Sequence, residues 1–207
     1  DGYLLYVAIA DVSEYVLQDS SLDKEALSRA TSVYFEKKVI PMLPELISNK
    51  LCSLRPNEDK LVLTCEIYLD KEGEIKSFEF FNSVICSKNR LTYDEVEKFY
   101  QKGQTALSED IVSNLNALKK IHALRRKIRE ERKAIDFYLP EYRPVGKDNK
   151  IIKFKSINHL LANEVIEESM ILANICAAKF TKKIKKPIPF RHHDNPDYNC
   201  LLYTSDA

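Results

Sequence analysis

Residues 61–86, LVLTCEIYLDKEGEIKSFEFFNSVIC, carry the clearest β-strand pattern in the chain. Apolar and polar residues alternate on both sides of residues 70–74, DKEGE, and this alternation is typical of strands with one buried face. Gly73 lies in the turn, where glycine readily adopts the backbone conformations that tight turns need. The stretch therefore predicts an antiparallel β-hairpin.

The chain opens on a second apolar run, residues 3–10, with the sequence YLLYVAIA. This run predicts a strand that is buried on both faces and follows a turn at Asp1-Gly2. A strand needs a partner, and the sequence begins without an initiator Met. We therefore expect the chain to be part of a longer protein.

Two long helices are predicted in the second half of the chain. Residues 107–135 repeat apolar side chains every three to four positions, which indicates one amphipathic helix. Residues 157–182 present a wide apolar face that is rich in small residues, so we expect this helix to be largely buried.

Shorter elements are predicted from their start signals. Ser21 and Asp23 offer N-cap oxygens for a helix that runs to Tyr34, and Thr92 with Glu95 forms a capping box. A helix at Pro44 and a strand at residues 151–154 are also expected. Together the elements predict a single α+β domain, in which a mixed or antiparallel sheet packs with two long helices.

Composition excludes several classes of protein. The chain has 207 residues, 44% of them hydrophobic and 30% charged, as globular proteins do. Its 32 basic residues nearly balance its 31 acidic ones, so bulk charge does not indicate a nucleic-acid partner. No apolar run is long enough for a membrane span and no signal peptide opens the chain, so we predict a cytoplasmic protein.

Two local features leave alternatives open or predict no site. The second half of the 107–135 helix is strongly basic, which indicates either a solvated face or a surface that follows phosphates. The five cysteines are irregularly spaced and form no zinc-ligand pattern, so we expect reduced, buried thiols.

A set of motifs in fixed order resembles the catalytic (RNB) domain of the ribonuclease II / ribonuclease R family, with a lean toward the R type. The resemblance covers nearly the whole chain to about residue 197. Its motifs are LLYVAIADVSEYV, LDKEALSRATSVYFEKKVIPMLPELISNKLCSL, LTCEIYLDKEGEI, SKNRLTYDEV, AIDF, NEVIEESMILANICAAKF and FRHHDNP.

The resemblance implies a processive 3′-to-5′ exoribonuclease that acts as a monomer on single-stranded RNA and releases nucleoside 5′-monophosphates. It also implies Mg²⁺ ions held by aspartates upstream of the strand at residues 3–10. None of that cluster is present, and Asp11 lies outside the motif, so no metal ligand is assigned and the chain alone is predicted to be inactive.

Four residues match positions that touch RNA in the family. Tyr34 and Phe137 match aromatic residues that stack on bases from the two sides of the channel. Tyr93 matches the tyrosine that positions the 3′-terminal nucleotide near the scissile phosphate. Glu167 matches a glutamate that contacts that nucleotide, and a carboxylate on a helix with a broad apolar face needs a partner or a wet cavity.

Several residues near these motifs are expected to have other roles. Glu168 should face solvent or a neighbouring basic group, and Asp11 should be a turn or cap residue. His122 and His159 should be structural or exposed. No chemistry is assigned to His192 and His193 in FRHHDNP. His192 departs from the family pattern, which usually has an apolar residue between the Arg and the His-Asp pair.

The remaining alternatives concern the domain limits and the loss of catalysis. We expect a partial RNB domain at residues 1–199 and a non-native tail at residues 200–207, CLLYTSDA. The competing hypothesis for the function is an RNB-fold homologue that has lost catalysis and holds RNA or protein partners. An unrelated α+β enzyme would have to match all the motifs by chance.

Overall fold

The computed structural model describes residues 2–35, 38–103, 106–134, 141–147, 150–157 and 159–189. The chain divides into two compact units, residues 1–173 and 174–207. Helix α4 (Leu161–Lys183) begins in the first unit and ends in the second. The motif residues Tyr34, Tyr93 and Glu167 all belong to the first unit. Phe137, His192, His193 and the tail at residues 200–207 lie outside the described residues.

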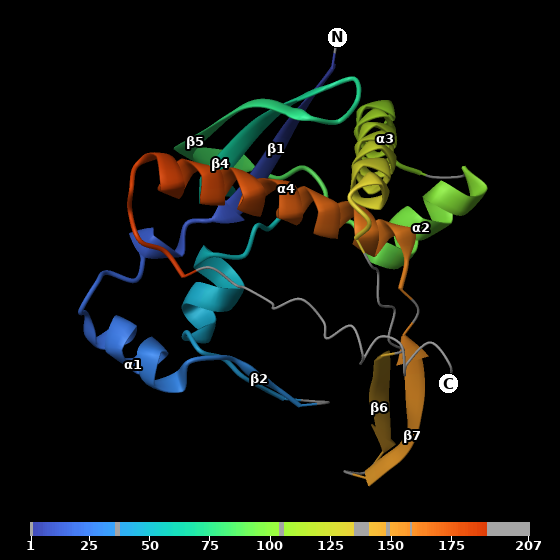
Figure 1. Ribbon diagram of the computed structural model, residues 1–207. Coiled ribbons are helices and arrows are strands. Elements are labelled where there is room, and N and C mark those ends of the chain that lie inside the picture. Colours follow the sequence, from blue (N-terminus) through green and yellow to red (C-terminus); the bar gives the residue numbers. More distant parts are fainter. Residues whose placement is uncertain are drawn as a thin grey trace, which may run out of the picture. The chain divides into compact units, whose positions relative to one another are not determined.

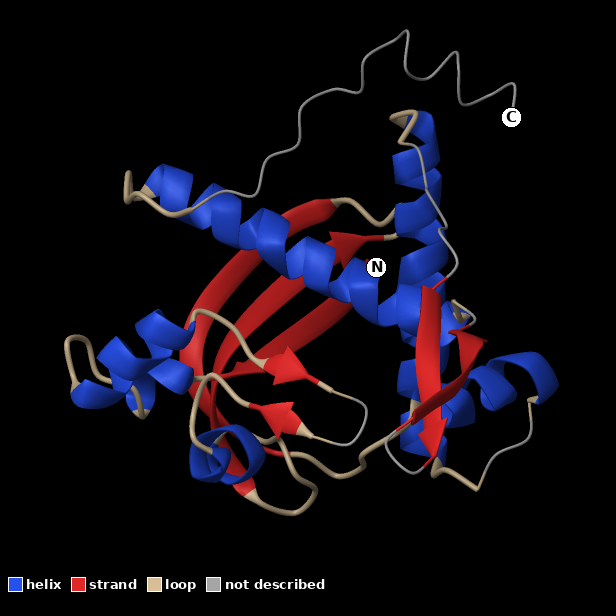
Figure 2. Cartoon of the chain, turned by 90° about the horizontal axis from the view of Figure 1, so that it is seen from below, coloured by secondary structure: helices blue, strands red, loops and turns tan. Residues whose placement is uncertain are grey.

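A three-stranded antiparallel sheet forms the centre of the first unit (Figure 1). Its strands are β1 (Gly2–Ala10), β4 (Asp59–Asp70) and β5 (Ile75–Cys86), in the order β1-β4-β5. The pairing of β4 with β5 confirms the predicted hairpin. Figure 2 shows this sheet as a curved, twisted layer, with two further hairpins as separate ribbons.

The hairpin turn is fixed by hydrogen bonds within the turn and by the close approach of a helix. The Asp70 carboxylate accepts hydrogen bonds from the backbone N–H groups of Glu72, at 3.1 Å, and Glu74, at 2.8 Å. Gly73 has a φ of +86°. A Cβ atom at this position would lie 2.8 Å from the Cβ of Leu124, so glycine is required both by the backbone and by the close approach of helix α3 (Glu109–Glu131).

The prediction that the first strand is buried on both faces is wrong. Leu5 and Val7 are buried, whereas Leu4 and Tyr6 on the opposite face are exposed. On β4 the buried side changes along the strand, from Val62 and Thr64 at one end to Cys65, Ile67 and Leu69 at the other. This change of the buried face along one strand is not revealed by a continuous apolar sequence.

Helix α1 (Ser21–Arg29) is shorter than expected. Its N-cap is Ser20, whose hydroxyl accepts a hydrogen bond from the N–H of Asp23, rather than Ser21 or Asp23. The helix ends at Arg29 because Ala30 takes a φ of +60°. The predicted helical position of Tyr34 is therefore wrong, since Tyr34 lies on a short strand beyond this turn.

The other helices agree with the prediction in kind. Helix α2 (Tyr93–Lys102) follows the predicted capping box, with Gly103 in the left-handed region at its end. A short π-helical segment, η2 (Leu46–Leu51), follows Pro44, and a 3₁₀ turn, η1 (Val12–Glu14), follows β1. Where one short strand was expected at residues 151–154, β6 (Glu141–Lys147) and β7 (Lys150–Ile157) form a hairpin.

Polar contacts connect the helices of the first unit. The Tyr100 hydroxyl on α2 donates to the Leu115 carbonyl on α3 at 3.0 Å. The Ala162 N–H at the start of α4 donates to the Glu97 carboxylate on α2 at 3.1 Å. Ala162, Val165 and Leu172 are buried, so this part of α4 is a core helix, as its wide apolar face predicts.

The second unit is described only as far as residue 189. It contains the end of α4, where the Thr181 hydroxyl donates to the Ala177 carbonyl at 2.9 Å. Lys182 and Lys183 occupy the last turn, which favours cations. The helix ends at Lys183, and Lys185 in the turn that follows has a φ of +54°.

None of the helices in the described ranges is long and apolar enough to cross a membrane. The expectation of buried thiols holds for Cys65 on β4, but Cys86 at the end of β5 is exposed. At Cys52, which is partly buried, desolvation is the main cause that raises the pKa of the thiol.

Candidate functional site

Tyr34 lies on an exposed hairpin made of β2 (Val33–Tyr34) and β3 (Val39–Ile40). The base of the hairpin is fixed because the Ser32 hydroxyl accepts a hydrogen bond from the Met42 N–H at 2.9 Å. The Arg29 guanidinium adds a bond to the Pro41 carbonyl at 3.2 Å. The Tyr34 side chain is 78% exposed, so its ring is available to a ligand without any rearrangement of a core.

Tyr93 is the first residue of α2, directly after the N-cap Thr92. The capping box holds this turn through bonds from the Glu95 N–H to the Thr92 hydroxyl, at 3.3 Å, and from the Thr92 N–H to the Glu95 carboxylate, at 2.8 Å. The hydrogen bond from the Thr92 side chain is the main cause that lowers the pKa of Glu95. Tyr93, which is 48% exposed, is thus attached to a rigid helix start.

The two adjacent glutamates of α4, Glu167 and Glu168, differ in exposure in a way that the sequence did not lead us to expect. The Glu167 side chain is 58% exposed, whereas that of Glu168 is 3% exposed. The expected need of a partner or a wet cavity, which follows from the cost of a buried carboxylate, therefore concerns Glu168 rather than the exposed Glu167. Its position could have been found in the sequence, since Glu168 follows Val165 by three residues and precedes Leu172 by four, on the buried stripe of the helix.

Glu168 is paired with two arginines of α3, which confirms the basic neighbour that was one of its two expected surroundings. Its Oε1 lies 3.3 Å from Nε of Arg125, and its Oε2 lies 3.6 Å from Nη1 of Arg129. Arg125 is itself 4% exposed and donates to the Gly73 carbonyl at 3.1 Å. Its Nη1 also lies 3.7 Å from the Glu74 carboxylate. Arg125 is therefore neither part of a solvated face nor available to phosphates.

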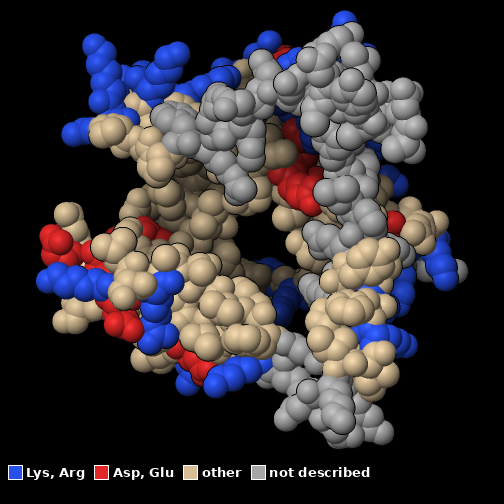
Figure 3. Space-filling view, turned by 60° about the horizontal axis from the view of Figure 1, so that its bottom comes forward, with Lys and Arg blue, Asp and Glu red and all other residues tan. Residues whose placement is uncertain are grey.

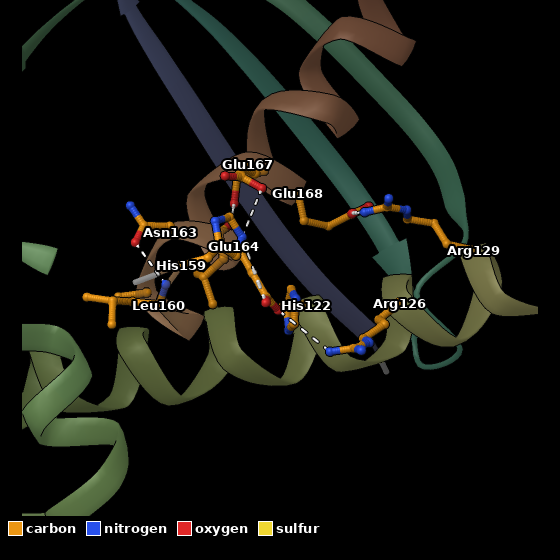
Figure 4. A network of polar contacts seen from close by, with 12 residues as sticks. His122, Arg126, Arg129, His159, Leu160, Asn163, Glu164, Glu167 and Glu168 are labelled. Carbon is orange, nitrogen blue, oxygen red and sulfur yellow. Dashed lines mark hydrogen bonds and ion pairs between the residues drawn. The ribbon is translucent and has the colours of Figure 1, made fainter. Parts of the chain in front are cut away.

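A third carboxylate of α4, Glu164, lies one turn before Glu167 and Glu168 (Figure 4). Its Oε2 is 3.2 Å from Nε2 of His122 and 3.7 Å from Nη1 of Arg126, both on α3. Nε2 of His159 lies 3.8 Å from Oε1 of Glu164 and 3.7 Å from Oε2 of Glu167. The sequence analysis missed this cluster because it weighed each histidine alone.

The three predicted site residues that the structure describes make no described contact with one another. They are Tyr34, Tyr93 and Glu167, which lie on β2, α2 and α4. In Figure 3, Lys and Arg side chains and Asp and Glu side chains both border a broad uncharged area. No single sign of charge covers the part of this face that the structure describes.

A metal ion needs several side-chain ligands that lie close together. Within the described ranges, no group of three or more His, Cys, Asp and Glu side chains could hold one. Asp11 follows β1 and is buried; its carboxylate accepts bonds from the Ser13 hydroxyl and from Nδ2 of Asn82, the latter at 3.2 Å. These residues therefore do not fit a metal site.

The sequence matches the RNB domain over residues 1–202. The chain belongs to the RNB-domain family. Ribonuclease R of Escherichia coli is 42% identical over 203 residues, which are 97% of this chain and 25% of the relative. The chain thus spans about a quarter of the length of this relative. The motifs indicated the ribonuclease R type rather than the ribonuclease II type, and the similarity to ribonuclease R agrees with that.

Solved structures of the RNB family show the same fold. Mycoplasma genitalium RNase R in complex with ribose-methylated single-stranded RNA is 36% identical, with a TM-score of 0.90 over 96% of this chain and 31% of that one. The same enzyme in complex with double-stranded RNA is 35% identical, with a TM-score of 0.91 over 98% of this chain and 36% of that one. The α+β fold class predicted from the sequence is confirmed.

Proposed function

We propose that this chain is the nucleotide-positioning part of a 3′-to-5′ processive exoribonuclease of the ribonuclease II/R type, which hydrolyses single-stranded RNA to nucleoside 5′-monophosphates. The observation that carries the proposal is the similarity of nearly the whole chain to an RNase R solved with single-stranded RNA. The exposed ring of Tyr34 on its hairpin supports it from the geometry of this chain.

Tyr34 and Phe137 are proposed to stack on the bases of the incoming strand. Stacking suits an enzyme that accepts any sequence, because every base offers a π-face. The hairpin keeps the Tyr34 ring in solvent and its backbone fixed, which lowers the entropy that binding costs. Phe137 would meet the strand from the other side.

Tyr93 and Glu167 are proposed to act on the 3′-terminal nucleotide. Tyr93 offers a ring and a hydroxyl from the capped start of α2, and Glu167 offers carboxylate oxygens that accept hydrogen bonds from ribose hydroxyls. Both side chains are half-exposed, so each can reach a ligand without unfolding its helix.

Relatives of the ribonuclease R type imply a divalent metal cofactor, which we propose to be Mg²⁺ held by ligands outside the described residues. Because the described residues do not fit a metal ion, no step of hydrolysis is assigned to them. We also propose that the 207-residue chain alone binds RNA but does not degrade it.

The test is the affinity of the chain for a short, fluorescently labelled oligoadenylate with a free 3′ hydroxyl, measured by anisotropy. Tyr34→Ala is expected to raise Kd about 5- to 150-fold, which corresponds to the roughly 1–3 kcal/mol that one stacked base contributes. Tyr142→Ala is the matched control, because Tyr142 is an exposed tyrosine on another hairpin, β6–β7. Equal affinities of the two variants would refute the role of Tyr34.

The same samples separate an inactive part of a nuclease from an active enzyme. With Mg²⁺ added, the chain should release no mononucleotides on chromatography. Release of nucleoside 5′-monophosphates would overturn the proposed inactivity. Binding without hydrolysis in a protein extended at the N-terminus to include the upstream aspartates would favour the competing hypothesis, an RNB-fold protein that only holds RNA.

A further inference from the structure

His159 precedes α4 and its side chain lies between two carboxylates of that helix (Figure 4). Glu164 and Glu167 are three residues apart, so they occupy neighbouring positions on one face, where like charges repel. The single nitrogen Nε2 of His159 lies within 3.8 Å of an oxygen of each. A proton on this nitrogen therefore meets both carboxylates at once.

The chain segment that carries His159 is fixed to the helix. The N–H of Leu160 donates to the side-chain Oδ1 of Asn163 at 3.2 Å, and the N–H of Asn163 donates to the Leu160 carbonyl at 2.9 Å. The first bond is the half of a capping box in which a side chain near the third helical position accepts from the N-cap N–H, and the second is an ordinary backbone bond of the first turn. The backbone next to His159 thus cannot move independently of α4.

Glu164 is fixed as well, from the side of α3. His122 and Arg126 approach its Oε2, and its side chain is only 19% exposed. Arg126 is shared with Glu130, whose Oε1 lies 3.3 Å from its Nε. Glu164 is therefore the anchored carboxylate of the pair. The Glu167 side chain is more than half exposed, so the surrounding protein restricts its conformation less.

We propose that His159 is a positioning residue: it bridges the anchored Glu164 to Glu167 and so fixes where the Glu167 carboxylate meets the 3′-terminal nucleotide. The inference rests on the proposed role of Glu167 in RNA binding. Among the ion pairs described for the chain, Glu164 and Glu167 are carboxylates that His159 meets, and Glu164 also meets His122 and Arg126.

The first measurement concerns position alone. Three-bond couplings measured by NMR report the side-chain rotamers of Glu167 in the 207-residue chain without RNA. One dominant rotamer is expected in the unmodified chain and an averaged set in His159→Gln. His159→Arg, which keeps a cation, should restore the dominant rotamer. Couplings of Glu167 that are unchanged in His159→Gln would overturn the inference.

The second measurement concerns the ligand, again by anisotropy with the labelled 3′-hydroxyl oligoadenylate. His159→Gln should raise Kd about two- to fivefold, the range expected of an exposed ion pair. His159→Arg, which keeps a cation beside the two carboxylates, should keep the affinity.

A double-variant comparison with Glu167→Gln completes the test. If His159 acts through Glu167, His159→Gln should have no further effect in the Glu167→Gln background. An equal loss in both backgrounds would overturn the inference. A third outcome is that Glu167→Gln leaves Kd unchanged while the Glu167 couplings still respond to His159→Gln. That result would refute the proposed role of Glu167 in RNA binding. It would also refute the positioning role of His159 for RNA, although it would confirm the contact between the two side chains.

Discussion

Replacement of Arg125 by Met is the most direct test of how α4 is held. Arg125 is 4% exposed and joins three elements, because it bonds to Glu168 on α4 and to the Gly73 carbonyl in the hairpin turn, and itself lies on α3. Methionine fills much of the same volume but leaves the buried Glu168 carboxylate and the carbonyl without this donor. Arg129, 3.6 Å from Glu168, compensates only in part.

The expected cost lies near the lower end of the range for a broken buried ion pair, about 3 kcal/mol of the free energy of unfolding. For a chain of this length that corresponds to a fall in Tm of roughly 6–12 °C. The assay is urea unfolding followed by circular dichroism, with a thermal scan of the same samples. A loss below about 1 kcal/mol would refute the reasoning, because it would mean that the pair is hydrated or that α4 readjusts.

Two further variants make the test specific. Arg126→Met changes the adjacent residue, whose side chain is 48% exposed, and should alter the free energy of unfolding by no more than about 1 kcal/mol. The double variant Arg125→Met, Glu168→Leu removes both charges and should recover most of the loss, since apolar replacement of a whole buried pair is often neutral. A double variant less stable than Arg125→Met would contradict this account.

Two other predictions concern the turns at the ends of the sheet and of α2. Thr92→Ala removes the N-cap hydroxyl and should cost about 1 kcal/mol of stability in urea unfolding, whereas Thr92→Ser should retain most of it. At Asp70, the hydrogen bond from Lys76 and then that from the Glu74 N–H hold the pKa below its usual value. The stability that Asp70 contributes is therefore present above the unfolded-state pKa of about 3.9, and it is lost as the pH falls through the folded-state value. An NMR titration should show the pKa of Asp70 rising in Lys76→Met, and an unchanged midpoint would contradict the assigned cause.

The parts of the fold that the sequence predicted are those with strong local signals. In the hairpin at residues 61–86, apolar and polar residues alternate over two long strands. The Thr92–Glu95 capping box is a side-chain pattern that indicates a helix start. The β2–β3 hairpin has two residues in each strand, too few for any periodicity. The positive φ of Ala30, which ends α1 early, has no signal in an alanine.

The candidate site was predictable only in part, for a different reason. The motifs named Tyr34, Tyr93 and Glu167, but contacts between α3 and α4 depend on how two helices face each other. Helical spacing alone could have placed Glu168 on the buried stripe. It could not have shown that Arg125 and Arg129 lie opposite, because the residues of the basic run look alike in sequence.

The bonds of Arg125 also bear on the order in which the first unit folds. They close separations of 43 residues to Glu168 and 52 residues to Gly73, whereas the β4–β5 hairpin joins adjacent strands. Local pairings form before contacts that must close long loops, so we expect this ion pair to be made after the rate-limiting step. Loss of Arg125 should then appear as faster unfolding with a nearly unchanged folding rate, which makes the residue a determinant of the lifetime of the native state.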